Sequence, residues 1–396
     1  MSLCTTRKNR SALALVAFGA IALLAGNFVC STAFGQATLS PLTTFGSNGW
    51  LAPGSNSYLS TSNFERGIGW NPVTNNLVLP SRNGGNFVAI LDGTSGAVIK
   101  TMDTTGVGGG TLALMGAGVT DDGKIYVPNL QSGSNNLNPF KVYSWLGESD
   151  TSAPSTAFSQ VLPQTTSGNF RYGDAFAVFG SGTSATFAAA GSTTGTTAGL
   201  PNNGNFMIGS LDGSNTSTIY RNIPSTQTAT NDYRLGMAFV DADTIIGTQG
   251  ASAKLTDFVA APTLSNTGAT VTAAIATGAA ARPLDYTVLD GKSLLALVDT
   301  NNSGISVYDI TNPLSATLLT TGSTVVGTLA TNVNGAGGLQ WGATLNQYQQ
   351  VVYAMSTNQG IQAMIFTVPE PSTYAVMGSA FAVIGLVASR KRRSEG

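Results

Sequence analysis

Residues 66–102 read RGIGWNPVTNNLVLPSRNGGNFVAILDGTSGAVIKTM. Four short apolar runs begin in this stretch, at Gly67, Leu77, Asn86 and Ala97. Pairs and triplets of Asn, Asp and Gly separate the runs, and these residues are the ones that tight turns between antiparallel strands favour. The stretch therefore predicts one four-stranded antiparallel sheet.

The same pattern of apolar runs and turn residues restarts along the rest of the chain. Further units begin at Gly116, Arg171, Arg234, Arg282 and Gly337. The last of these units stops after three strands, at about residue 367. A supersecondary unit that recurs at intervals of this size is typical of radially repeated sheets.

The start of the body supplies the missing strand. Residues 37–45, ATLSPLTTF, resemble the outer strands predicted at 97–102 and 316–321. Pairing the first strand of the chain with the last sheet closes a ring and removes its open edges. The sequence thus predicts an all-β fold, a six-bladed β-propeller closed by its N-terminal strand.

Two alternatives to this fold stay open at the level of sequence. A degenerate unit within 250–281 would give seven blades. An elongated β-solenoid or a two-sheet sandwich would also accommodate many short strands, although a sandwich does not normally restart one pattern six times.

Composition excludes several classes of function. Charged residues make up 9% of the chain and hydrophobic residues 42%, which disfavours a coiled coil and allows a sizeable core. The net charge is −1 and basic clusters occur only near the ends, so nucleic acid is not an expected partner. The chain contains no histidine, which excludes Ser-His-Asp and Cys-His catalysis and histidine-ligated zinc.

Residues 1–35 have the form of a secretory signal peptide. A basic start precedes an apolar run from Ala12 to Ala25, and small residues follow near Gly35. Both cysteines, Cys4 and Cys30, lie in this segment, so the exported chain would have no thiol and no disulfide. The segment predicts signal peptidase and the secretion machinery as partners.

Residues 368–396 have a three-part order of their own. An apolar stretch of sixteen residues, 374–389, would form a helix of about 24 Å, close to the shortest that crosses a membrane. A Pro-Glu-Pro motif precedes this stretch, and four cations follow it and favour a cytoplasmic end. The motif is Val368, Pro369, Glu370, Pro371, Ser372 and Thr373, and the basic tail is Arg390, Lys391, Arg392 and Arg393.

This combination resembles the PEP-CTERM sorting signal of Gram-negative bacteria. The resemblance implies an exosortase-like enzyme that cuts near the motif, after transient anchoring in the inner membrane. It also implies transfer of the body to the cell surface or extracellular matrix, often in organisms that build exopolysaccharide. The alternative is an ordinary anchor that stays in the membrane. Without both terminal segments, residues 36–367 keep 11 Lys and Arg against 17 Asp and Glu, a net charge of about −6.

Four arginines occupy equivalent positions at the starts of four units. They are Arg66, Arg171, Arg234 and Arg282. Because the first strand of a propeller blade lines the central channel, these side chains are candidates for a ring at one channel mouth that binds an anion or an acidic sugar. The favoured alternative is structural, because each has a carboxylate within three residues, and this predicts ion pairs within or between blades. These carboxylates are Glu65, Asp174, Asp232 and Asp285.

Other candidate sites are weaker. Residues 299–304 place oxygen ligands at alternate positions but lack the acidic twelfth residue of a calcium loop, where Ile310 stands. The pair Asp241 and Asp243 and the glycine-rich run 106–110 are better interpreted as turns than as a catalytic pair and a phosphate loop. Four aromatic residues could stack on sugar rings or fill gaps between blades: Trp50, Tyr58, Trp70 and Trp145. We therefore predict no catalytic residue, no metal and no cofactor.

The function that these patterns favour is that of an exported surface or matrix protein. Its propeller would bind polysaccharide or another protein without catalysis. The alternative is a secreted carbohydrate-active hydrolase or lyase that uses carboxylates, although the sequence points to no carboxylate pair at a defined separation.

Overall fold

The computed structural model describes most of the body of the chain. The described residues are 36–133, 138–161, 169–194, 205–220, 223, 227, 232–248, 250–258, 268–278, 281–300, 304–323 and 335–369. Residues Ala37–Val368 form one compact unit. The predicted signal peptide 1–35, and the predicted sorting signal from Glu370 onward, lie outside the described residues.

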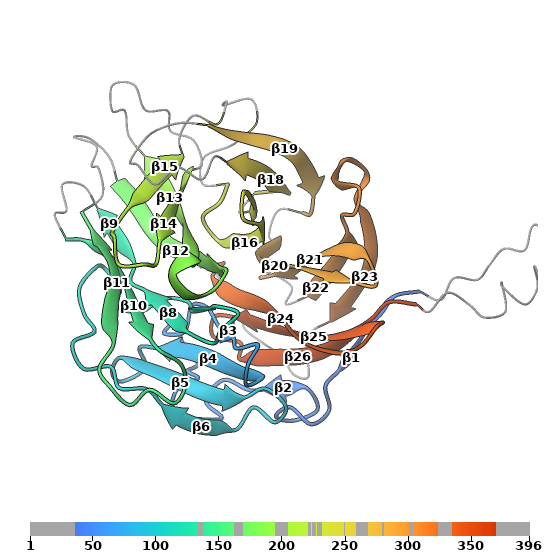
Figure 1. The fold of residues 1–396 in the computed structure, drawn as a ribbon. Helices are drawn as coiled ribbons and strands as arrows, with labels where there is room; N and C mark the ends of the chain where they lie inside the picture. Colours follow the sequence, from blue (N-terminus) through green and yellow to red (C-terminus); the bar gives the residue numbers. More distant parts are fainter. Residues whose placement is uncertain are drawn as a thin grey trace, which may run out of the picture. The chain divides into compact units, whose positions relative to one another are not determined.

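Six antiparallel sheets follow one another around a ring, and in each sheet the strands run in order from the centre outward (Figure 1). Blade 1 contains β3 (Gly69–Trp70), β4 (Asn76–Ser81), β5 (Phe87–Asp92) and β6 (Val98–Thr101). Blade 2 contains β7 (Gly118–Val119), β8 (Ile125–Pro128), β10 (Phe140–Trp145) and β11 (Ser155–Gln160). Blade 3 contains β9 (Gln131–Gly133), β12 (Asn169–Phe179), β13 (Thr186–Thr194), β14 (Asn205–Ser210) and β15 (Ser217–Tyr220).

The second half of the ring repeats this order. Blade 4 contains β16 (Gly236–Asp241), β17 (Thr244–Thr248), β18 (Ser252–Phe258) and β19 (Ala269–Ala276). Blade 5 contains β20 (Ala281–Leu289), β21 (Lys292–Asp299), β22 (Gly304–Asp309) and β23 (Thr317–Ser323). Blade 6 contains β24 (Gly337–Asn346), β25 (Gln349–Ser356), β26 (Ile361–Thr367), β1 (Thr38–Pro41) and β2 (Trp50–Leu51). The helical elements described are two short 3₁₀ turns, η1 (Gly182–Ser184) and η2 (Pro313–Ser315).

The N-terminal strand closes the ring. β1 pairs antiparallel with β26, with Thr38 opposite Thr367 and Pro41 opposite Met364. The outer strand of the last blade therefore comes from the start of the body, next to the end of the body (Figure 1). The predicted six-bladed β-propeller with N-terminal closure is confirmed. The stretch 250–281 supplies β18 and β19 of blade 4, which excludes the seventh blade, and the solenoid and sandwich are excluded as well.

The core consists of six apolar clusters, and each cluster lies between two neighbouring blades. The alternation along β4 shows why. Leu77 and Leu79 pack toward blade 6, whereas Val78 between them packs toward blade 2. Side chains two residues apart share a face of a strand, so a fully apolar strand serves both neighbouring interfaces. The short apolar runs of the sequence are thus buried on both faces.

Strand direction divides the propeller into two faces. The innermost strands, β3, β7, β12, β16, β20 and β24, run the same way, and the arginines predicted at the unit starts lie at or near their beginnings. We call this end of the channel the arginine face. At the opposite end β24 turns into β25, and there Thr38 and Thr367 lie side by side. We call this end the terminal face, because the body begins and ends there.

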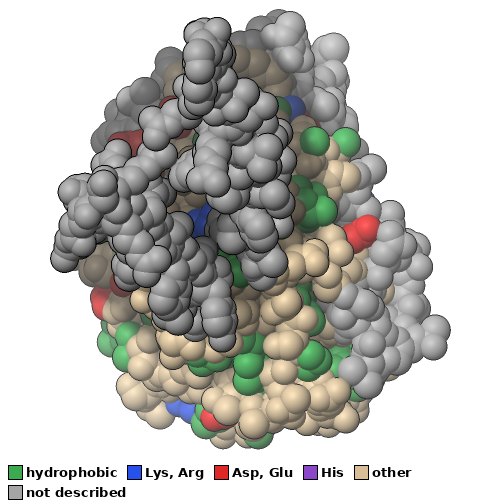
Figure 2. Space-filling model, turned by 90° about the vertical axis from the view of Figure 1, so that its right-hand side faces the viewer, with side chains coloured by type: hydrophobic (Ala, Val, Ile, Leu, Met, Phe, Trp, Pro, Cys, Tyr) green, Lys and Arg blue, Asp and Glu red, His purple; other side chains and the backbone are tan. Residues whose placement is uncertain are grey.

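The visible outer surface carries few charged side chains. In Figure 2 the uncovered part of the molecule is mostly uncharged, with hydrophobic side chains scattered singly and isolated charged ones between them. This agrees with a chain that has only 9% charged residues. Among the described residues no helix is long and apolar enough to cross a membrane.

Candidate functional site

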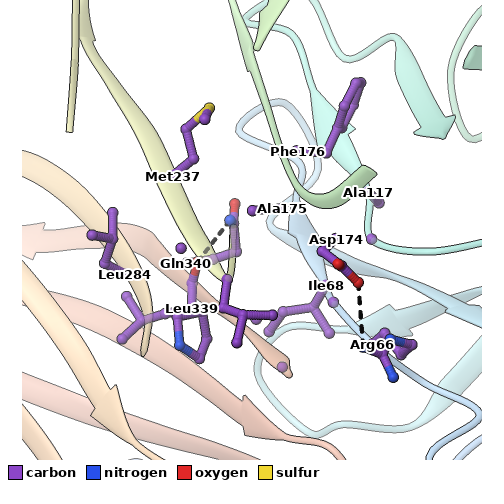
Figure 3. A pocket seen from close by; sticks show the side chains of 17 residues that line it. Arg66, Ile68, Ala117, Asp174, Ala175, Phe176, Met237, Leu284, Leu339 and Gln340 are labelled. Atoms are coloured by element: carbon purple, nitrogen blue, oxygen red, sulfur yellow. Dashed lines mark hydrogen bonds and ion pairs between the residues drawn. The ribbon is translucent and has the colours of Figure 1, made fainter. Parts of the chain in front are cut away.

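A cavity lies at the centre of the ring, where the innermost strands of all six blades meet. The space inside it that a water-sized sphere can enter is small, about 40 Å³ measured at the sphere's centre. Every blade contributes to its lining, with Ile68, Ala117, Phe176, Met237, Leu284 and Gln340 as one representative from each. In Figure 3 Arg66 and Asp174 lie together at one side of the cavity, and Leu284 and Met237 lie across from them. Ligand sites are usually concave, with a small number of polar groups that fix the orientation of the ligand.

Asp174 is the centre of a charge cluster at this cavity. Its side chain is completely buried and contacts three guanidinium groups. Arg171 donates from Nε to Oδ2 and from Nη2 to Oδ1, the latter at 2.8 Å. Arg234 donates from Nε to Oδ2 at 2.9 Å, and Arg66 from Nη2 to Oδ1 at 3.4 Å. One carboxylate from blade 3 thus joins arginines from blades 1, 3 and 4.

A bulge in β12 places Asp174 in the channel. The pairing of β12 with β13 shifts register between Tyr172 and Phe176, so that Gly173 and Asp174 leave the ladder. Gly173 has φ +100°, and a Cβ on it would lie 2.3 Å from the carbonyl oxygen of Asn129. Only glycine fits at this point, and the bulge turns the next side chain toward the arginines.

The cluster holds more positive than negative charge. Burial opposes ionisation of Asp174, but the hydrogen bond from Arg171 and the charges of the three arginines outweigh it and hold the pKa of Asp174 below its usual value. Burial also lowers the pKa of Arg66; Asp174 acts in the opposite direction, and the like charges of Arg171 and Arg234 lower the pKa further. The three guanidiniums are therefore close enough to repel one another.

Two further arginines extend the cluster on either side. Burial and the charge of Arg234 lower the pKa of Arg282, whereas Asp299 raises it. On the other side, burial and the charge of Arg66 lower the pKa of Arg82. Arg82 also donates from Nη2 to the carbonyl oxygen of Asn63 at 2.9 Å. A sequence search for unit-initial arginines missed Arg82, because it follows the second strand of blade 1 rather than preceding the first.

The positions of the predicted arginines differ in detail from the sequence interpretation. Arg66 and Arg234 precede the innermost strands β3 and β16, as predicted. Arg171 and Arg282 lie within β12 and β20, and the prediction that each stands before its strand is wrong for these two. The reason for Arg171 is that β9, a strand the sequence did not indicate, pairs with the first part of β12 and extends it.

The ion pairs run both within a blade and between blades, since Arg171 lies in the blade of Asp174 and Arg66 and Arg234 in others; two of the neighbouring carboxylates have partners of another kind. Glu65 is buried, and its oxygens accept hydrogen bonds from the hydroxyls of Ser60 and Ser81, each at 2.8 Å. Asp285 accepts from the backbone N–H groups of Trp341 at 2.8 Å and Tyr286 at 2.9 Å. These carboxylates are satisfied by hydroxyl and amide donors, which leaves Asp174 as the partner of three arginines.

Asp285 lies in a second cavity, closer to the terminal face. Phe179, Phe239 and Tyr286 are among the side chains that line it with Asp285. Burial raises the pKa of Asp285 to about 7, although the N–H groups of Trp341 and Tyr286 act in the opposite direction. A carboxyl group with such a pKa can hold or release a proton near neutral pH. Nothing in the sequence around Asp285 indicated this property.

The weaker candidates are turns and packing residues. Asp241 and Asp243 are exposed in the β16–β17 turn, and the Asp243 N–H donates to Oδ1 of Asp241 at 2.9 Å. Asp299 and Thr300 are described, but the next three residues of the calcium-loop candidate lie outside the described residues. Within the described ranges no group of three or more acidic side chains is placed to hold a metal ion.

The glycine run and the aromatic candidates also have structural positions. Residues 106–110 lie in the loop between β6 and β7. Trp145 is buried between blades 1 and 2. Three partly buried rings have partners within the fold: Trp50 donates from Nε1 to the carbonyl oxygen of Gln359, Trp70 donates from Nε1 to Asn75, and Tyr58 packs edge-on against Phe87.

Comparison with known proteins identifies no family. No protein-family model matches the chain, and no curated protein matches it. Among solved structures, a DUF4623 family protein from Bacteroides eggerthii matches with a TM-score of 0.57 at 14% identity, over 85% of this chain and 76% of that one. The likeness is one of fold. A structure of the nidogen/laminin complex matches with a TM-score of 0.39 at 10% identity, over 66% of this chain and 80% of that one.

Proposed function

We propose that this protein is an exported component of the cell surface or extracellular matrix, and that its propeller is a non-enzymatic binding module for polysaccharide or another protein. The observation that carries the proposal is the central cavity, to which all six blades contribute and beside which three arginines converge on Asp174. A site assembled from six separate units is held rigidly by the ring, and rigid sites bind without first paying an ordering cost.

The terminal segments support the location. The signal-peptide pattern of 1–35 and the PEP-CTERM-like pattern of 368–396 belong to exported proteins that an exosortase-like enzyme processes. Within the propeller, Thr38 and Thr367 pair at the terminal face, so both ends of the body leave from the face opposite the arginines. A body attached through its C-terminal end would therefore keep its arginine face free for a ligand.

The location is tested in the native Gram-negative host, with a tag inserted in a surface loop of the propeller. We expect a mature chain that lacks residues 1–35 and the segment after Pro371, recovered from the cell surface or the medium. Recovery of the chain with its C-terminal Gly396 in the inner membrane would overturn the sorting proposal and favour a permanent anchor.

A specific observation keeps the enzymatic alternative in view. The Asp285 carboxyl lines a cavity and has a pKa raised to about 7, as a general acid requires. A carbohydrate-active hydrolase or lyase would use this group together with a second carboxylate.

One experiment separates binding from catalysis. Residues 36–368, which include the whole closed ring, are applied to a glycan array and in parallel to a panel of polysaccharide substrates, with and without calcium. We expect retention of one class of glycan with no shortening of any substrate. Depolymerisation by the wild-type propeller that is lost in Asp285→Asn would overturn the non-enzymatic proposal. If the propeller has no glycan ligand, the array will retain none of it. That result would overturn the proposal that the propeller binds polysaccharide.

A further inference from the structure

We infer that the arginine cluster is a binding site for the carboxylate of a hydroxylated anion, with a uronic acid unit of an acidic polysaccharide as the ligand class. The inference rests on the proposed function, because it names the ligand of the same propeller. It assigns ligand contact to Arg171 and Arg234 and a positioning role to Asp174.

The first step is the balance of charge. Asp174 supplies one negative charge to three guanidinium groups, so two positive charges in this cluster are not compensated by its own carboxylate. Burial and mutual repulsion both lower the pKa of Arg66. A purely structural salt bridge around a buried aspartate needs one arginine, and each additional guanidinium adds repulsion. An anion that enters the cluster would remove this repulsion.

The second step is the direction of the free donors. The Asp174 side chain is completely buried, whereas the side chains of Arg171 and Arg234 are 26% and 28% exposed. Each guanidinium has five N–H groups, and among the described residues Arg234 donates to Asp174 only through Nε. Its terminal nitrogens remain for a second acceptor. Asp174 thus orients two partly exposed arginines. Arg171 uses Nε and Nη2 on Asp174, whereas Arg234 keeps both terminal nitrogens, and such a pair of donors matches the two oxygens of a carboxylate.

Arg66 belongs to the same cluster but lies deeper. Its side chain is 7% exposed, and its Nε is buried with no hydrogen-bond acceptor among the described residues. A buried donor without a partner costs free energy, and in a ligand site it is often completed by the ligand or by water. Arg66 is therefore the floor of the proposed site rather than its entrance.

The third step concerns the rest of the ligand. Glycines of three blades line the cavity next to Arg66 and Asp174: Gly67, Gly116 and Gly338. Gly67 and Gly338 are buried, and a Cβ on either would lie within 3 Å of the neighbouring blade, so these glycines let the innermost strands approach one another closely at the cavity. Gln340 adds an amide oxygen, because its Nε2 donates to the carbonyl oxygen of Leu339 at 2.7 Å. The polar side chains of the lining, Arg66, Asp174 and Gln340, are the groups that can bind the hydroxyls of a sugar acid.

The experiment measures affinity by calorimetry on residues 36–368. The probes are a short oligogalacturonate, a neutral oligosaccharide of equal length, polyglutamate and inorganic sulfate. The variants are Arg171→Ala, Arg234→Ala and Arg234→Lys. The control is Lys292→Ala, which also breaks an ion pair, at 2.6 Å to Asp309, but near the terminal face.

We expect oligogalacturonate to bind in preference to the neutral oligosaccharide, with an affinity that falls as salt is raised. Each arginine-to-alanine variant should weaken it about tenfold or more, since each removes a charge-assisted hydrogen bond. Arg234→Lys should fall between Arg234→Ala and wild type, because lysine keeps the charge without the fork of donors. Lys292→Ala should bind as wild type does. If Arg171→Ala does not fold, Arg234→Lys and wild type still provide the comparison.

Several outcomes would overturn the inference. Equal affinity of the arginine variants, or equal binding of the neutral oligosaccharide, would refute the anion site but leave the propeller as a glycan-binding module. Tighter binding of polyglutamate than of oligogalacturonate would reassign the site to an acidic protein. Stabilisation by sulfate alone, with no oligosaccharide bound, would limit the cluster to small inorganic anions and would also refute glycan binding by the propeller.

Discussion

Replacement of Phe45 tests how strongly the N-terminal segment closes the ring. Phe45 is 0% exposed and belongs to the apolar cluster between blade 1 and blade 6. Its ring lies 5.8 Å from the ring of Tyr353, at 55°. Gly96 packs against its other side, where a Cβ would lie 3.2 Å from the Phe45 ring. Phe45→Ala would leave a cavity between rigid strands that cannot close around it, at a cost of about 3–5 kcal/mol.

This cost converts into a shift of the melting temperature. The entropy of unfolding is about 2.1 cal/mol/K per residue, or about 0.7 kcal/mol/K for the roughly 330 residues of the propeller. The expected decrease in melting temperature is therefore about 4–7 °C, measured by calorimetry on residues 36–368. Leu314→Ala is the control, because Leu314 is 82% exposed and its loss should leave the melt within about 1 °C of wild type. A Phe45→Ala melt indistinguishable from that of Leu314→Ala would refute the argument that this segment holds the first and last blades together.

Three further predictions concern the channel, and each is measured by denaturant titration. Asp285 has a pKa raised to about 7, so between about pH 8 and 5 the folded state takes up a proton that the unfolded chain does not. The free energy of unfolding should therefore rise as the pH falls through this window, and Asp285→Asn should flatten the rise. Asp174 has a lowered pKa, so the stability that it provides should be present at neutral pH and lost as the pH falls below 3.8. Asp174→Asn should therefore lower the free energy of unfolding by about 3–5 kcal/mol at pH 7 and by little in acid. Gly338→Ala should cost about 1–3 kcal/mol, because its Cβ would lie 2.5 Å from the backbone nitrogen of Ile68, whereas Gly108→Ala meets no atom within 4 Å and should be nearly neutral.

The fold could be predicted because its determinants are local. In residues 66–102 each strand is a short apolar run, and each boundary is a turn of Asn, Asp or Gly. β4, β5 and β6 lie within one residue of the predicted runs at each boundary. Closure could be predicted too. The last blade lacks one strand, the start of the body has one strand without a sheet, and pairing the two removes both open edges.

The gathering of arginines at one channel mouth could be predicted from their positions in the units, but the carboxylate that they share could not, because it depends on contacts between distant residues. Arg66 and Asp174 are 108 residues apart, and Arg234 and Asp174 are 60 residues apart. Glu65 is next to Arg66 in the sequence, but its oxygens accept hydrogen bonds from two serine hydroxyls. Which carboxylate enters the channel was decided by the bulge at Gly173, a feature that leaves no periodic signal.

The proposed point of attachment and the arginine cluster lie at opposite faces of the propeller. Both ends of the body lie at the terminal face, where Thr38 pairs with Thr367 in the sheet that closes the ring. The arginines lie at the other end of the innermost strands, where each blade begins. The innermost strands run in the same direction in all six blades. A propeller attached through its terminal face would therefore have its arginine face on the side away from the attachment. A propeller processed and presented through residues beyond Val368 would thus direct its positive cluster away from the point of attachment, and this orientation follows from topology rather than from any single contact.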